Sequence, residues 1–222
     1  MMPGWPSRGC LKLGDMRADT VHNADILVIG SGIAGLSAAI TAAEKGLSVI
    51  VITKDSALEE SNTYYAQGGI VSRGLHDKPE ILIDDIFKAG DGISNLEAVK
   101  VLALDGPVLV ENFLVRKIKV PFSRSKESGY EYAQEAGHSK RRILHHMDST
   151  GRAIEESLVK KAGETPNLRI FPNYTAIDLL SIPHHSKSPL ALYREPQCIG
   201  AYVLNNLTES VERIFATYVI LA

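Results

Sequence analysis

The sequence predicts an α/β domain built on a parallel sheet with helices on both faces. Three consecutive segments indicate it: an apolar run at Asp25–Ile29, an Ala-rich helical segment at Leu36–Lys45 and a second apolar run at Ser48–Thr53. Strand, helix and strand within about thirty residues form a βαβ unit, whose two strands are parallel. Gly46 follows the helical segment, where a helix commonly ends on glycine.

The rest of the chain continues this alternation. Helical patterns are predicted at Pro79–Ala89, at Asn95–Arg116 with an interruption at Gly106-Pro107, and at Thr150–Lys161. Strands are predicted at Leu168–Phe171, Ala176–Leu180, Ile199–Leu204 and Phe215–Leu221. Loops are predicted at Pro121–Glu135 and at Ser181–Pro196. We therefore expect a single domain over residues 24–222, preceded by a flexible leader over residues 1–23.

Composition and charge exclude several classes of protein. The 222 residues include 24 Lys and Arg against 26 Asp and Glu, so the formal charge of −2 provides no general attraction for nucleic acid or an anionic membrane. No apolar stretch reaches the length that a membrane span needs. The two cysteines, Cys10 and Cys198, cannot form a disulfide framework. We expect a cytoplasmic protein that binds neither nucleic acid nor membrane.

Adjacent histidines at His145-His146 and His184-His185 raise the question of a metal site. Neighbouring residues point in different directions in regular structure, and no Cys, His or carboxylate spacing completes a ligand set. We expect no metal.

A glycine-rich turn follows the first predicted strand and opens the first predicted helix. In Gly30-Ser-Gly32-Ile-Ala-Gly35, the first glycine permits a tight turn, the second lets the backbone approach a pyrophosphate, and the third lets the helix pack closely on the sheet. The helix N-terminus then presents N–H donors to the phosphates. The alternative is a glycine-rich turn without a ligand. This context favours a Rossmann-like dinucleotide site.

The end of the second strand bears on which dinucleotide is bound. An Asp or Glu normally accepts a ribose hydroxyl there, but the sequence is Thr53-Lys54-Asp55. Lys54 cannot accept a hydrogen bond, so the usual ribose contact is either missing or displaced to Asp55. This disfavours a simple NAD dehydrogenase.

Three further blocks carry a family resemblance. Ser61–Ile70 resembles the S-T-x-Y-A-Q-G-G-I segment of L-aspartate oxidases, which belong to the succinate dehydrogenase and fumarate reductase flavoprotein family. Glu135–His145 is similar to that family's E-G-G-H-S-x-R-R-I-L-H, and Asp148–Glu155 to its D-x-T-G-R-x-I-E. The blocks occur in order and at matching spacing. The resemblance implies an FAD-binding domain that stops before the capping domain.

The resemblance also implies a set of FAD contacts. The pyrophosphate would lie at the turn, on Gly30, Ser31, Gly32, Ile33, Ala34 and Gly35, and Lys54 would lie near the ribose. The flavin and its ribityl chain would be surrounded by Asn62, Thr63, Tyr64, Tyr65, Ala66, Gln67, Gly68 and Gly69, and the adenine would lie beside Ala176. The alternative for residues 62–69 is an ordinary polar loop.

Two positions separate the branches of this family. Asn62 stands where succinate dehydrogenases and fumarate reductases commonly carry the histidine that bonds flavin covalently, so the resemblance implies non-covalent FAD. Glu135 stands where aspartate oxidases place the carboxylate that orients the substrate's α-ammonium group, and we assign it the catalytic position. His138, Arg141 and Arg142 are expected to organise the loop that carries Glu135 or to screen a dicarboxylate.

The implied reaction is oxidation of L-aspartate to iminoaspartate, with oxygen or fumarate as the electron acceptor. It is the first step of de novo NAD biosynthesis, in which quinolinate synthase consumes the imine. Family members are much longer than this chain, so we expect it to be an amino-terminal part that lacks the capping and C-terminal helical domains, with little activity alone. The alternatives are a dehydrogenase-like relative, against which Asn62 and Glu135 argue, and a non-catalytic flavin-binding remnant.

Overall fold

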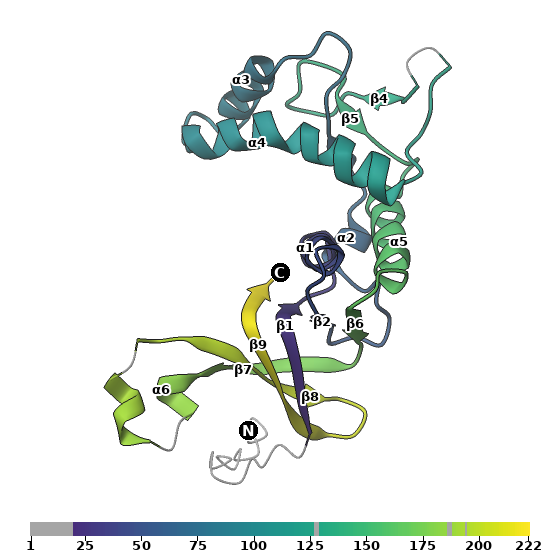
Figure 1. The fold of residues 1–222 in the computed structure, drawn as a ribbon. Coiled ribbons are helices and arrows are strands. Elements are labelled where there is room, and N and C mark those ends of the chain that lie inside the picture. Colours follow the sequence, from purple (N-terminus) through teal and green to yellow (C-terminus); the bar gives the residue numbers. More distant parts are fainter. Residues whose placement is uncertain (1–19, 127–128, 186–187, 194) are drawn as a thin grey trace, which may run out of the picture.

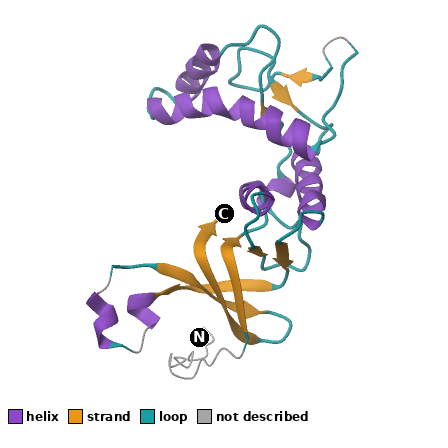
Figure 2. Ribbon diagram, in the orientation of Figure 1, coloured by secondary structure: helices purple, strands orange, loops and turns teal. Residues whose placement is uncertain are grey.

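The computed structural model describes residues 20–222 apart from 127–128, 186–187 and 194. Cys10 and nearly all of the expected leader lie outside the described residues. The main sheet has the strand order β6-β2-β1-β9-β8-β7 (Figures 1 and 2). Its strands are β1 (Val21–Ile29), β2 (Val49–Ile52), β6 (Leu168–Phe171), β7 (Tyr174–Ser181), β8 (Cys198–Asn205) and β9 (Ser210–Leu221). Strands β6, β2, β1 and β9 are parallel, and β9, β8 and β7 form an antiparallel meander.

The predicted βαβ unit is present. Helix α1 (Ile33–Glu44) connects β1 to β2, which pair in parallel from Ile26 opposite Val49 to Ile29 opposite Ile52. Strand β1 begins at Val21, earlier than the predicted start at Asp25. The reason is a non-local one, because Val21–Ala24 pair with β9, nearly two hundred residues along the chain.

The two faces of the main sheet are covered differently. Helices α1 and α5 (Thr150–Gly163) lie on one face, where Val28 and Val51 pack with Leu36, Ile40 and Leu158. The core on the other face consists only of strand residues. Its buried members are Leu27, Ile50, Ile52, Ala201, Val203, Ile214 and Ala216. The expectation of a parallel sheet is confirmed. Helices were expected on both faces, but within residues 20–222, apart from the gaps given above, strands β8 and β9 supply the apolar cover of the second face.

A second layer of structure lies away from the main sheet, beyond α1, α2 (Asn62–Tyr65) and α5 (Figure 1). It contains α3 (Pro79–Ala89), α4 (Leu96–Leu109) and a π-helix (Val110–Ile118) that continues α4. A small antiparallel sheet completes it, with the order β3 (Ile70–Val71), β5 (Ile143–Leu144) and β4 (Tyr132–Ala133). None of these strands was predicted, and β4 lies inside the predicted loop Pro121–Glu135, because strands of two residues leave no alternating pattern in the sequence.

The predicted interruption at Gly106-Pro107 is wrong, since α4 runs through it. Pro107 has no N–H to donate to the Ala103 carbonyl one turn earlier. That carbonyl instead accepts a hydrogen bond from the Arg73 guanidinium at 3.0 Å. A side chain from outside the helix thus replaces the missing backbone donor.

The segment after β7 projects from the sheet. It contains α6 (Ile182–His185) and a 3₁₀-helix (Pro189–Tyr193), and the side chains of Leu190 and Tyr193 are exposed. No helix in the described part of the chain is long and apolar enough to cross a bilayer.

Candidate cofactor site

The glycine turn joins β1 to α1. Gly30 has a φ of +118°, which favours glycine over residues with a Cβ, and its N–H donates to the Ile52 carbonyl at 3.0 Å. A Cβ on Gly35 would overlap the Gly30 carbonyl oxygen, so glycine lets the first turn of α1 lie directly against the strand end. The turn therefore has the two conformational features that the sequence predicted for it.

Helix α2 packs beside this turn. Thr63 Oγ1 accepts the Ile33 N–H of the first turn of α1 at 3.0 Å, and Ser61 Oγ accepts the Tyr64 N–H at 3.2 Å as the N-cap of α2. On the other side the Gly151 N–H, at the start of α5, donates to the Ala66 carbonyl at 3.0 Å. Segment 61–66 is thus held between the glycine turn and α5.

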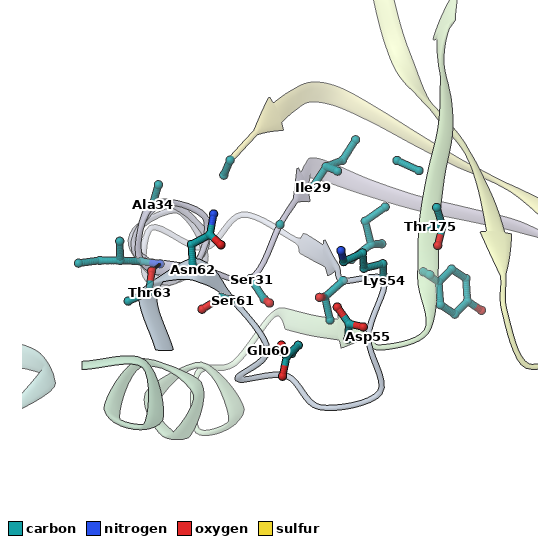
Figure 3. A pocket seen from close by; sticks show the side chains of 18 of the residues that line it. Ile29, Ser31, Ala34, Lys54, Asp55, Glu60, Ser61, Asn62, Thr63 and Thr175 are labelled. Carbon is teal, nitrogen blue, oxygen red and sulfur yellow. Dashed lines mark hydrogen bonds between the residues drawn. The ribbon is translucent and has the colours of Figure 1, made fainter. Parts of the chain in front are cut away.

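A cavity of about 590 Å³ opens at the carboxyl ends of the parallel strands (Figure 3). Its volume lies within the range typical of cofactor pockets. Figure 3 shows Ser31, Ser61, Asn62 and Thr63 grouped at one end and Lys54, Asp55 and Thr175 toward the other. Ten of the predicted cofactor residues line it: Gly30, Ser31, Gly32, Ile33, Ala34, Lys54, Asn62, Thr63, Tyr65 and Ala176.

Six predicted cofactor residues do not line this cavity: Gly35, Tyr64, Ala66, Gln67, Gly68 and Gly69. Gly35 lies behind the turn, against the Gly30 carbonyl. Gly68 and Gly69 lie farther along the chain toward β3, next to the Glu135 side chain, whose Oε1 accepts the Gly69 N–H at 2.9 Å. Contact of this segment with a flavin stays a prediction.

Asp55, which the sequence offered as an alternative ribose acceptor, also lines the cavity. The sequence interpretation missed eight lining residues: Ile29, Ile52, Thr53, Glu60, Ser61, Tyr174, Thr175 and Ala222. Those at the ends of β1 and β2 could have been found, because ligands of parallel sheets bind outside the carboxyl ends of the strands. Tyr174 and Thr175 carry no such signal. They reach the cavity because the chain turns back directly after β6, where the Tyr174 N–H donates to the Thr53 carbonyl at 2.9 Å.

A buried polar network fixes the Tyr174 side of the cavity. The Tyr174 hydroxyl donates to Glu212 Oε2 at 3.1 Å, and His22 Nε2 lies 2.8 Å from the same oxygen. Burial alone would raise the pKa of Glu212, but hydrogen bonds from Asn205, His22 and Tyr174 outweigh burial and lower it. The carboxylate is therefore ionised at neutral pH and anchors the tyrosine.

The electrostatics of the turn suit a diphosphate. The N-terminus of α1 carries a partial positive charge and faces the cavity through Ser31–Ala34. The Ser31 hydroxyl is buried and has no hydrogen-bond partner among the described residues, as expected of a group whose partner is a ligand. Lys54 adds a cation at the rim, and Asp55 beside it offers an acceptor for a ribose hydroxyl. These residues fit a dinucleotide.

Glu135 lies on a loop that a buried ion cluster holds in place. Arg142 is fully buried and donates to both carboxylate oxygens of Asp77 at 3.0 Å and to Asp85 Oδ2 at 2.7 Å. The Ser139 N–H and hydroxyl donate to the same Asp85 oxygen. The cluster connects the Glu135 loop to α3 and the segment before it, so Arg142 organises the loop as expected. Arg141, by contrast, is exposed.

The candidate metal residues do not assemble a site in the part of the chain that can be described. There, no three His, Cys, Asp or Glu side chains are grouped so that they could hold an ion. His146 Nδ1 hydrogen-bonds the Pro121 carbonyl. The side chains of His184 and His185 lie outside the described residues.

Proteins of similar sequence and similar architecture are known. The family model described as "FAD binding domain" matches residues 25–222. The L-aspartate oxidase of Acinetobacter baylyi is 37% identical over 207 residues, which are 92% of this chain and 36% of that protein. The L-aspartate oxidase of Halobacterium salinarum is 42% identical over 157 residues, 71% of this chain and 30% of that protein.

Among solved structures, a chain of the Mycobacterium smegmatis Sdh1 complex in the apo form has a TM-score of 0.79. It is 24% identical in sequence, and the match covers 91% of this chain and 34% of that one, a likeness that shows the fold. The chain spans about a third of the length of the relatives it matches.

Proposed function

Because this chain belongs to the family of FAD binding domains, we propose that its cavity holds FAD and that it forms the amino-terminal part of an enzyme that oxidises L-aspartate to iminoaspartate. Oxygen or fumarate accepts the electrons. The observation that carries the proposal is the contact between Glu135 and the Gly69 N–H. It sets a carboxylate beside the glycine pair that the resemblance assigns to the flavin.

The cofactor is held by three parts of the cavity. The backbone of Ser31–Ala34 and the N-terminus of α1 bind the pyrophosphate. Lys54 and Asp55 would hold the ribose, and Thr175 and Ala176 would form the wall beside the adenine. Asn62 lines the site with an amide that forms no covalent bond to flavin, so the cofactor is held non-covalently. FAD supplies the two-electron chemistry, and the protein supplies binding and orientation.

Glu135 supplies the preference for an amino acid. Its carboxylate is exposed next to Gly68 and Gly69 and can pair with the α-ammonium group of L-aspartate. Succinate has no cation to pair with it. The Gly69 N–H, already bonded to Glu135 Oε1, keeps the carboxylate oriented before substrate binds.

The instability of the product, iminoaspartate, also suggests the cellular compartment. The imine is unstable, so an enzyme that consumes it directly, quinolinate synthase in the pathway that the resemblance implies, would work in the same compartment. We propose the cytoplasm, where this route would open NAD biosynthesis.

The test uses a chimera in which residues 20–222 replace the matched region of the Acinetobacter baylyi relative. We expect bound FAD and aspartate-dependent peroxide formation. Replacing Glu135→Gln should lower kcat/KM for aspartate by about 10- to 100-fold, the range of a lost hydrogen bond to a charged group, and leave turnover of succinate unchanged. The exposed Glu131→Gln is the matched control.

A chimera that binds FAD but reacts equally with aspartate and succinate would contradict the substrate assignment. The 222-residue chain alone should bind FAD and show little peroxide formation. Robust turnover by it would contradict the expectation that further domains complete the site.

A further inference from the structure

Glu155 is a buried acid without a partner. Its side chain, on the second turn of α5, is 0% exposed, and neither carboxylate oxygen has a hydrogen-bond partner among the described residues. Burial disfavours the charged form and raises the pKa of Glu155 to about 7. The nearby Ser61 hydroxyl lowers this pKa, and the negative charge of Glu59 raises it further. A native core rarely retains such a group without a reason.

Ser61 connects Glu155 to the cofactor cavity. The Ser61 side chain lines the cavity, caps α2 through the Tyr64 N–H, and is the polar neighbour of the Glu155 carboxyl. Helix α2 in turn holds the first turn of α1 through Thr63. The carboxyl therefore lies behind the segment that joins the glycine turn to α5.

Among the described residues, no cation is bonded to the Glu155 carboxyl. On α5 itself, Arg152 is exposed and paired with Glu156. The elements packed against α5 carry charges that are paired elsewhere: Glu44 at the end of α1 pairs with Lys117 and Lys161, Glu111 and Arg116 of the π-helix pair with each other, and Arg169 on β6 donates to the Asn23 carbonyl. Two further carboxylates, Glu59 and Glu60, precede α2. The charge of Glu59 repels an ionised Glu155 and so raises the pKa of Glu155 further.

We propose that Glu155 is a positioning residue of the FAD site that works as a neutral acid. Once protonated, the carboxyl can turn to donate its O–H to the second lone pair of Ser61 Oγ. This bond would hold the 61–63 segment against the glycine turn and would leave the Ser61 O–H free to face the cofactor. Ionisation would remove this donor. It would also set a negative charge behind a site that binds a negatively charged pyrophosphate.

This inference rests on the FAD site proposed above and has a consequence for pH. If the FAD-bound state requires Glu155 to be neutral, FAD binding takes up a proton whenever the pH is above the pKa of Glu155 in the protein without FAD. Affinity for FAD then falls as the pH rises from about 6 to about 8.5, by roughly tenfold or more. A purely structural glutamate would lose affinity on substitution but would not produce this profile.

The test measures the Kd for FAD by quenching of its fluorescence at both pH values, for the unchanged chain and for Glu155→Gln. The glutamine can donate to Ser61 but cannot ionise, so its Kd should stay constant within about twofold and should be the tighter at high pH. Glu164→Gln, an exposed position at the end of the same helix, should keep the pH dependence of the unchanged chain. All three proteins carry the same histidines.

Calorimetry in two buffers of different ionisation enthalpy provides a second readout, since the unchanged chain should take up a proton on binding and Glu155→Gln should not. Equal pH profiles for the two proteins would overturn the role of Glu155 and leave the FAD site intact. Failure of the unchanged chain to bind FAD at either pH would overturn the site itself, and this inference with it.

Discussion

Removing the Arg142 guanidinium should cost a large part of the domain's stability. In Arg142→Met, Asp77 loses both of its 3.0 Å bonds and keeps the Lys78 N–H, while Asp85 keeps its bonds to Ser139. The Asp77 and Asp85 side chains are only 1% and 6% exposed, so water cannot replace the lost cation. Breaking a buried ion pair in this way costs about 3–5 kcal/mol, against a total of about 5–15 kcal/mol for a domain.

The unfolding free energy that Arg142→Met loses should depend on pH. Burial alone would raise the pKa of Asp85, but in the unchanged protein the hydrogen bonds from Ser139 and Arg142 lower it. The ionised Asp85 therefore stabilises the fold at pH values above its unfolded pKa, and this contribution is lost as the pH falls through the folded pKa. Without Arg142, only the Ser139 hydrogen bonds oppose burial, so the pKa of Asp85 is higher than in the unchanged protein, and protonation at low pH relieves the uncompensated charge. The difference in unfolding free energy between the two proteins should therefore be larger at about pH 7 than at about pH 4.5.

Urea unfolding followed by circular dichroism measures both effects. Arg141→Met, at the exposed neighbouring position, should change the unfolding free energy by no more than about 0.5 kcal/mol. Adding Asp77→Asn and Asp85→Asn to Arg142→Met should restore more than half of the loss, since no buried charge then remains. A loss below about 1 kcal/mol in Arg142→Met, or no recovery with the asparagines, would refute this account of the cluster.

Three further substitutions follow from the site. Gly35→Ala should lower the unfolding free energy by about 1–3 kcal/mol and weaken FAD binding, because its Cβ overlaps the Gly30 carbonyl; equal FAD affinity would count against the close approach. Thr63→Val should cost about 1 kcal/mol in urea unfolding, since the Ile33 N–H loses its acceptor, and an unchanged midpoint would contradict this. Because the pKa of Glu155 is raised in the folded state, the unfolding free energy of the unchanged chain should fall as the pH rises from about 4.5 to about 7. Over that range the unfolding free energy of Glu155→Gln should increase by up to about 3 kcal/mol relative to the unchanged chain. Parallel profiles of unfolding free energy against pH would contradict the raised pKa.

Local patterns were sufficient for much of the fold. The helix Pro79–Ala89 and the strand Leu168–Phe171 have the predicted bounds, and α1 and β2 lie within a few residues of theirs. The glycine turn also needed only the local sequence, because Gly30 and Gly35 are required by backbone geometry between adjacent elements. Nine of the nineteen residues that line the cavity were predicted from the glycine turn, Lys54 and the 62–65 segment, the last of these from the family resemblance.

Long-range contacts decided the rest. The early start of β1 depends on pairing with β9, the passage of α4 through Pro107 depends on Arg73, and the apolar cover of the second sheet face comes from β8 and β9. No window of sequence around these positions contains the partner.

The βαβ unit, the glycine turn and the chemistry of the residues around it could be read from the sequence, since these depend on neighbours along the chain. The raised pKa of Glu155 and the burial of Arg142 arise from contacts that form only on folding. A carboxyl or guanidinium group has the same intrinsic chemistry at every position, and its charge and role depend on the solvent and the partners that folding leaves it.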